Sequence, residues 1–194
     1  SIFESIESND SRRHLQLKSP VSLEPIGELV CANTEDVQAA IARARAAQPA
    51  WAATPMKDRA AIIYRALEIV LERQDEIIET VVRETGKAPT DAMSMEVFSV
   101  ADQLCYYAKN AEKFLAPEKR KVHGLMKFMK QLRIVYKPLG VVGLITPWNG
   151  PFVLVMNQAT QAMLAGNTIV AKGSEVTPYS AKLAEDIFRQ AGLP

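Results

Sequence analysis

An uncharged stretch from Pro138 to Ala171 constrains the fold of this chain more than any other sequence feature. A transmembrane helix needs about 20 consecutive apolar residues, and this stretch is longer. Pro147 and Pro151 interrupt it, however, and Asn157 and Gln158 would be left without partners in lipid. We therefore interpret the stretch as part of the buried core of a soluble protein.

Two apolar segments and one helical segment alternate within this stretch. Residues 141–146 favour a buried parallel strand, and residues 168–171 predict a second one. Residues 152–165 predict a helix between them. The order strand, helix, strand is a β-α-β unit, which predicts an α/β fold with a parallel sheet.

Polar residues follow both predicted strands. Pro147-Trp148-Asn149 ends the first, and Lys172-Gly173-Ser174-Glu175 leaves the second. Open α/β sheets bind ligands at the carboxyl ends of their strands, so we expect a carboxamide, an ammonium and a carboxylate to line one crevice. Two simpler interpretations stay open. Asn149 could close a turn on its own backbone, and Lys172 with Glu175 could be a surface ion pair of little energetic value.

The order and spacing of these motifs resemble the aldehyde dehydrogenase superfamily, in its N-terminal portion. The matching segments, which together span roughly residues 17–194, are Ser19-Pro20 to Ile26-Gly27-Glu28, Ala46-Ala47 to Ala50-Trp51, Pro55 to Arg59, Glu84-Thr85-Gly86-Lys87, Gly140-Val141-Val142-Gly143 to Pro147-Trp148-Asn149, Leu164-Ala165-Gly166-Asn167-Thr168, Lys172-x-Ser174-Glu175-x-Thr177-Pro178 and Ala191-Gly192-Leu193-Pro194. The resemblance implies a Rossmann-like doubly wound parallel sheet, incomplete in this chain, with a small β oligomerisation arm.

The resemblance also implies roles for the residues at the predicted strand ends. Asn149 would donate a hydrogen bond to the oxyanion that forms when a Cys thiolate attacks an aldehyde. The implied cofactor-binding residues are Ile145, Thr146, Pro147, Trp148, Lys172, Ser174 and Glu175. A carboxylate at Glu175 would bind the adenosine ribose and repel a 2′-phosphate, so the expected cofactor is NAD, with NADP as the alternative.

The same resemblance places Gly150, Val153, Leu154 and Asn157 along the aldehyde tunnel. Gly150 stands where relatives often carry an aromatic ring. Its missing side chain could widen the tunnel for a bulkier or aromatic aldehyde, or another residue could refill the space. Both interpretations stay open.

We divide the chain into four parts. They are an N-terminal tail (1–16), the N-terminal part of the cofactor-binding domain with a hairpin and helices (17–120), a β arm (121–138) and the first β-α-β-α of the NAD-binding sheet (139–194). Within the arm, Gly124 is expected to separate strands at 121–122 and 125–136. The resemblance implies that the arm pairs across subunits in a homodimer or homotetramer, although its charge spacing fits an edge hairpin equally well.

Upstream of the arm we expect a helix over residues 75–85, ended by Gly86 in a left-handed conformation. A further helix is expected over residues 90–115. It would place Cys105 on an inward face as a small core residue.

The composition argues against several other classes of protein. A formal net charge of +1 with 23% charged residues gives no basic excess for nucleic acid, and no segment suits a membrane. His14 and His123 lack partners at metal-ligand spacing, so no metal is expected. Cys31 and Cys105 give no disulfide framework, and no signal peptide opens the chain, so we expect a cytoplasmic protein.

The resemblance implies that the nucleophilic Cys and the general-base Glu of the family lie beyond Pro194. We therefore expect this chain to be the front part of an NAD-dependent aldehyde dehydrogenase that oxidises an aldehyde, such as a semialdehyde or an aromatic aldehyde, to a carboxylic acid. Alone, the chain is expected to be inactive. Two alternatives remain: a non-catalytic assembly or nucleotide-binding module, and a CoA-acylating or reductive member of the same superfamily.

Overall fold

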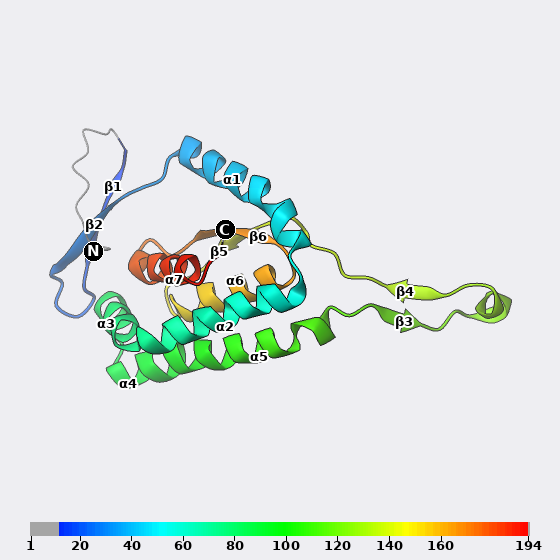
Figure 1. The fold of residues 1–194 in the computed structure, drawn as a ribbon. Coiled ribbons are helices and arrows are strands. Elements are labelled where there is room, and N and C mark those ends of the chain that lie inside the picture. The colour runs from blue at the N-terminus through cyan, green and yellow to red at the C-terminus, as the bar shows by residue number, and fades with distance from the viewer. Residues whose placement is uncertain (1–11, 194) are drawn as a thin grey trace.

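The computed structural model describes residues 12–193 and shows helices on both faces of a parallel strand pair (Figure 1). Strands β5 (Val141–Ile145) and β6 (Thr168–Lys172) form the pair. Helix α1 (Thr34–Ala53) lies on one face and α6 (Val153–Leu164) on the other. Helix α7 (Pro178–Gln190) follows β6. The α/β class and the predicted β-α-β unit are confirmed.

The two strands are less buried than the sequence predicted. Within β5 and β6, Leu144 is the one residue classed as buried, whereas Ile145 is 80% exposed. In the described part of the chain, each strand has only the other as a neighbour. A parallel sheet becomes fully buried when further strands and helices cover it, and two strands cannot achieve this.

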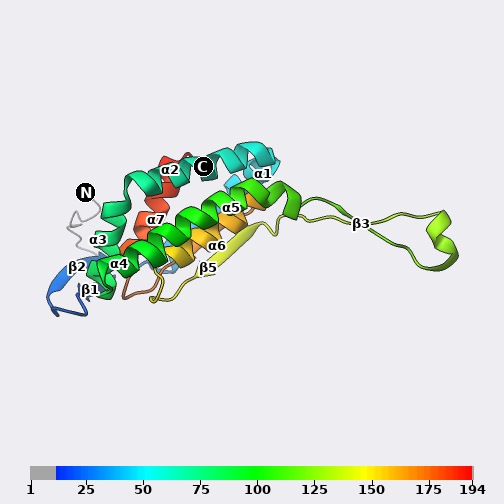
Figure 2. The same cartoon turned by 90° about the horizontal axis from the view of Figure 1, so that it is seen from below.

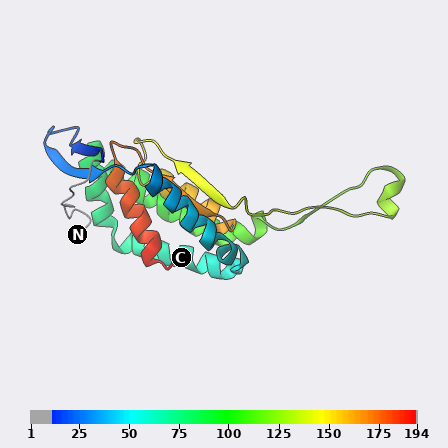
Figure 3. The ribbon, with the colours of Figure 1, turned by 90° about the horizontal axis from the view of Figure 1, so that it is seen from above.

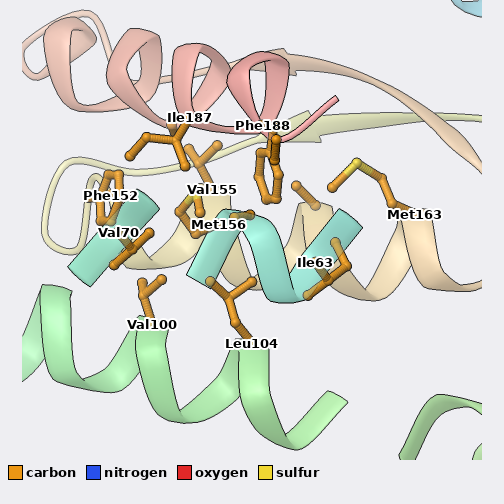
Figure 4. Packing of buried hydrophobic residues seen from close by; sticks show 14 of the residues in the cluster. Ile63, Val70, Val100, Leu104, Phe152, Val155, Met156, Met163, Ile187 and Phe188 are labelled. Carbon is orange, nitrogen blue, oxygen red and sulfur yellow. The ribbon is translucent and has the colours of Figure 1, made fainter. Parts of the chain in front are cut away.

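The hydrophobic core lies mainly among the helices, and the strands reach it through Leu144, with Val142 and Ile169 packed against it. Helix α2 (Met56–Glu72) packs on α6 and α7, and α5 (Ser99–Phe114) packs on α2 and α6 (Figure 4). The buried side chains at this packing include Ile63, Val70, Val100, Leu104, Phe152, Val155, Met156, Met163, Ile187 and Phe188. Burying one such side chain contributes about 1.5–3 kcal/mol, so this core holds the N-terminal turns of α6 and α7 in place.

Helix α3 (Gln74–Thr85) ends as predicted at Gly86, which has φ 73°. The single helix expected over residues 90–115 is instead divided. Its parts are α4 (Pro89–Ala92), the π-helical turn η1 (Met93–Phe98) and α5. Hydrophobic spacing does not distinguish a π-turn from an α-turn inside one helical segment. Cys105 is exposed rather than in the core, because the buried face of α5 carries Leu104 and Ala108.

An antiparallel hairpin precedes the helices. Strand β1 (His14–Lys18) pairs with β2 (Pro25–Val30), in a register that starts at His14↔Val30. The first strand therefore begins inside the stretch expected to be a tail, since leucine alternation already starts at Leu15. Residues 1–11 of that expected tail lie outside the described residues.

A long arm extends away from the helices (Figures 1 and 2). Its paired strands are β3 (Glu118–Arg120) and β4 (Leu132–Ile134), joined through a 3-10 turn η2 (Gly124–Phe128). The strands expected at 121–122 and 125–136 are therefore wrong in position. Solvent on both faces of the arm leaves no packing to extend the pairing, so the ladder covers only three residues per strand.

Candidate functional site

The carboxyl ends of β5 and β6 lie at one edge of the sheet. The parallel register runs to Ile145↔Lys172, and the Thr146 N–H donates to the Lys172 carbonyl oxygen at 3.1 Å. The segments 147–149 and 173–175 therefore leave the sheet side by side. Figure 3 shows the loops after β5 and β6 emerging at the same end of the molecule. The expected pairing of the two strand ends is present.

The side chain of Asn149 is exposed at this edge. Among the described residues, no protein group hydrogen-bonds to its carboxamide; the Asn149 carbonyl oxygen instead accepts from Lys87 Nζ at 2.8 Å. Asn149 therefore does not close a turn with its own side chain. Its carboxamide N–H groups remain available as hydrogen-bond donors.

Lys172 and Glu175 form a solvent-exposed ion pair on the loop after β6. Lys172 Nζ lies 3.1 Å from Glu175 Oε2, and the side chains are 61% and 66% exposed. A backbone N–H at Glu175 and, next, the Lys172 ammonium lower the pKa of the Glu175 carboxyl, so it is ionised at neutral pH. Such an exposed carboxylate can accept hydrogen bonds from the hydroxyls of a ribose. Ser174 is buried, and its Oγ accepts from the Val176 N–H at 3.4 Å.

The other residues at the end of β5 differ in exposure. Ile145 and Trp148 are 80% and 61% exposed, and Pro147 is exposed as well, whereas Thr146 is buried. The three exposed residues place apolar surface beside the polar groups of Asn149, Lys172 and Glu175. An apolar surface bordered by a few polar groups is typical of a ligand site.

The expected tunnel residues start helix α6. Gly150 is buried, Val153, Leu154 and Asn157 are half-buried, and Asn157 Oδ1 accepts from Gln161 Nε2 at 3.0 Å. A Cβ added to Gly150 would lie 3.0 Å from Val153 Cγ1 and 3.3 Å from Leu154 Cγ. The space beside Gly150 is thus already occupied by its neighbours, which favours refilling over a widened tunnel.

Two residues that sequence reasoning missed hold the turn after β5. The Glu96 side chain is fully buried, and its Oε2 accepts from the N–H groups of Phe152 at 3.2 Å and Val153 at 2.8 Å. Its other carboxylate oxygen pairs with Lys87 Nζ. Glu96 thereby satisfies backbone donors at the start of α6 that have no partner within the helix.

Glu84 holds the neighbouring loop in the same way. Its buried carboxylate accepts from the N–H groups of Tyr179 at 2.6 Å and Ser180 at 2.8 Å, and from Ser180 Oγ at 2.5 Å. These amides begin α7. Burial raises the pKa of the Glu84 carboxyl, and the hydrogen bonds from Ser180 and Tyr179 oppose that shift. Glu84 and Lys87 belong to the Glu-Thr-Gly-Lys segment noted in the sequence, but contacts 62 to 96 residues apart gave no local signal.

The sequence profile of the Aldehyde dehydrogenase family matches residues 6–194 of this chain. The chain belongs to the aldehyde dehydrogenase family. A relative from Mycolicibacterium smegmatis, which carries the name of a succinate-semialdehyde dehydrogenase (NADP+), is 36% identical over 97% of this chain and 36% of its own length. The chain therefore spans about a third of the length of the curated relatives that it matches.

Solved aldehyde dehydrogenase structures share the fold of this chain. An NAD-dependent benzaldehyde dehydrogenase from Corynebacterium glutamicum superposes with a TM-score of 0.85 at 32% identity, over 95% of this chain and 39% of that chain. A succinate-semialdehyde dehydrogenase from Burkholderia pseudomallei superposes with a TM-score of 0.87 at 28% identity, over 95% of this chain and 37% of that chain.

Two further observations bear on the site and its surroundings. Within residues 12–193, no group of three or more His, Cys, Asp and Glu side chains is placed to hold a metal ion. In the same part of this aldehyde dehydrogenase chain, the helices are too short or too polar to cross a bilayer.

Proposed function

We propose that this chain supplies the N-terminal part of an NAD-dependent aldehyde dehydrogenase. The reaction would oxidise an aldehyde to a carboxylic acid through a thioester on a Cys outside this chain. The observation that carries the proposal is the parallel register of β5 and β6. Because of this register, the segments that hold Asn149 and the Lys172–Glu175 pair leave the sheet at the same edge. Membership of the aldehyde dehydrogenase family supports it.

Asn149 is the proposed oxyanion donor of the reaction. Its exposed carboxamide has no protein partner among the described residues, and its backbone is held by Lys87. A donor that is fixed before the reaction stabilises negative charge without reorganisation, and removing one costs about 10²–10³ in rate. This position would serve an aldehyde oxygen that becomes negatively charged.

The proposed cofactor is NAD, which accepts hydride when bound. The exposed Glu175 carboxylate fits the adenosine ribose, because it can accept from both hydroxyls. Lys172 beside it supplies donors for the same sugar, and Ile145, Pro147 and Trp148 offer apolar surface nearby. Thr146 and Ser174 are buried, so we assign them the shaping of the two loops. Relatives carry both NAD and NADP in their names, and we retain NADP as the alternative.

The proposed substrate is a semialdehyde or an aromatic aldehyde, following the names of the relatives. We further propose that the arm pairs with a second copy in a homodimer or homotetramer. Its apolar side chains, including Leu125, Phe128 and Met129, are exposed in the single chain. We keep the cytoplasm as the proposed location, because Cys31 and Cys105 are both free thiols.

Spectrophotometric rates of NAD reduction by the full-length enzyme test the function. We expect turnover with succinic semialdehyde or benzaldehyde, and a loss of about 10²–10³ in kcat for Asn149→Ala. Glu175→Ala should raise the KM for NAD and bring it closer to the KM for NADP. Turnover that required coenzyme A would favour the acylating class, and a wild-type enzyme without aldehyde oxidation would contradict the proposal.

A further inference from the structure

Lys87 holds one end of the turn that carries Asn149. Its Nζ donates to the Asn149 carbonyl oxygen at 2.8 Å, across 62 residues of sequence, and its side chain is only 18% exposed. Lys87 directly follows the left-handed Gly86, which ends α3. The contact therefore ties the turn after β5 to the end of α3, a helix that packs against α7.

Glu96 holds the other end of the same turn. One carboxylate oxygen accepts from the N–H groups of Phe152 and Val153, at 3.2 and 2.8 Å, and the side chain is fully buried. The negative charge also complements the positive end of the α6 dipole. The first turn of α6 is thereby fixed relative to η1.

The two holding residues are themselves joined. Lys87 Nζ donates to Glu96 Oε1, so one ion pair spans both ends of the segment 149–153. Glu96 belongs to the π-helical turn η1. A π-turn changes the direction of the following side chains, and such turns are frequent at functional sites.

The position of the Asn149 carboxamide depends on this support. No protein group among the described residues hydrogen-bonds to the carboxamide, and the one hydrogen bond from another side chain to Asn149 reaches its backbone carbonyl. An oxyanion donor must lie about 2.7–3.1 Å from the developing charge, and a misplacement of about 1 Å can cost roughly 10²-fold in rate.

We propose that Lys87 and Glu96 are a positioning pair for the oxyanion donor Asn149. They act through the backbone of residues 149–153 and do not touch the substrate. This inference rests on the proposed function, because it assigns a role in aldehyde oxidation.

Glu84 provides a matched comparison for Glu96. Both are buried carboxylates that accept from two successive amides at the start of a helix. Glu84 supports α7, which follows the Lys172–Glu175 loop, and its hydrogen bonds go to Tyr179 and Ser180 rather than to the Asn149 turn. Removing its charge should therefore affect cofactor binding more than the chemical step.

A double-mutant cycle in the full-length enzyme tests the pair. Lys87→Met should lower kcat by about 10- to 100-fold while KM for NAD changes by less than about threefold. In an Asn149→Ala background, the same substitution should cost less than about threefold, because the donor it positions is gone. Lys87→Arg should restore part of the loss.

Glu96→Gln and Glu84→Gln extend the cycle, with urea unfolding of each variant as the folding control. We expect Glu96→Gln to lose kcat in a manner coupled to Asn149, and Glu84→Gln to raise KM for NAD without such coupling. Should Glu96→Gln fail to fold, the Lys87→Met cycle decides alone.

Equal losses from Lys87→Met with and without the Asn149 carboxamide would overturn the inference, since a purely structural role acts equally in both backgrounds. That outcome would leave an active wild type and the proposed function intact. An inactive wild type would contradict the proposed function, and the positioning role with it.

Discussion

Glu84 and Glu96 show how single buried carboxylates shape the site. Each accepts backbone N–H groups at the start of a helix that follows a strand of the parallel pair. An unsatisfied buried donor costs about 1–3 kcal/mol, so each residue stabilises its loop as well as its helix. Glu96 pairs with Lys87, whereas the hydrogen-bond donors to Glu84 are the neutral groups of Tyr179 and Ser180, and burial raises the pKa of the Glu84 carboxyl.

The raised pKa of Glu84 predicts a pH dependence of stability. A carboxyl whose pKa is higher in the folded state binds its proton more tightly there. Its contribution to stability is therefore fully present below the unfolded value of 4.5 and is lost as pH rises through the folded pKa. Between these two pKa values, the unfolding free energy of the wild type should therefore fall relative to that of Glu84→Gln as pH rises.

Urea unfolding of the wild type and of Glu84→Gln across that pH range measures the difference. Comparing the two proteins cancels the titration of all other groups. If the wild type instead gains unfolding free energy relative to Glu84→Gln as pH rises, the hydrogen bonds from Tyr179 and Ser180 outweigh the effect of burial on the Glu84 pKa.

Gly150→Phe tests how the tunnel is filled. Val153 and Leu154 already crowd the space beside Gly150. We expect the larger side chain to destabilise the protein by about 1–3 kcal/mol and to leave the relative rates for acetaldehyde and benzaldehyde unchanged. Gly150→Ala is the smaller matched variant. A selective loss of benzaldehyde turnover in the Phe variant would instead support a tunnel widened by glycine.

Helix α3 depends on the conformation of its last residue. Gly86 has φ 73°, and an added Cβ would lie 2.7 Å from Val21 Cγ2 in the hairpin turn. Gly86→Ala should therefore cost about 1–2 kcal/mol in unfolding free energy. Gly143→Ala in β5 is the control, since its Cβ would meet nothing within 4 Å. Equal stability of both variants by urea unfolding would refute this account of the helix end.

The elements that sequence patterns predicted best are those with strong local signals. The predicted strands at 141–146 and 168–171, the predicted helix at 152–165 and the end of α3 at Gly86 agree with the structure to within one residue. The π-turn η1 was missed because its apolar spacing continues that of a helix. The arm strands were misplaced because solvent on both sides gives no burial pattern to read.

The residues of the candidate site also differ in whether the sequence alone could identify them. Polar residues directly after a strand could be found from the sequence, since strand ends have a known place in an α/β sheet. The supporting residues Lys87, Glu84 and Glu96 could not be found in this way. Their contacts join segments 56 to 96 residues apart, which only the packed fold brings together.

At the scale of the whole molecule, much apolar surface is left open. Leu125, Phe128 and Met129 are 85%, 78% and 81% exposed on the arm, and Ile145 is 80% exposed on the sheet. A surface of this kind commonly marks an interface or promotes association. The isolated chain is therefore expected to self-associate.

Light scattering after size-exclusion chromatography measures that association. Changing Leu125, Phe128 and Met129 together to Ser should lower the mass of the full-length enzyme toward a monomer. Leu71→Lys on α2, which is 49% exposed away from the arm, should leave the mass unchanged. A full-length enzyme that is already monomeric would contradict the proposed arm interface.

A crystal structure of the full-length enzyme with bound NAD tests the central claim most directly, because it measures where the cofactor lies. We predict that Glu175 Oε atoms lie within hydrogen-bond distance of the adenosine ribose hydroxyls, with the Asn149 carboxamide facing the same cleft. A cofactor bound on another face, distant from both residues, would contradict the account.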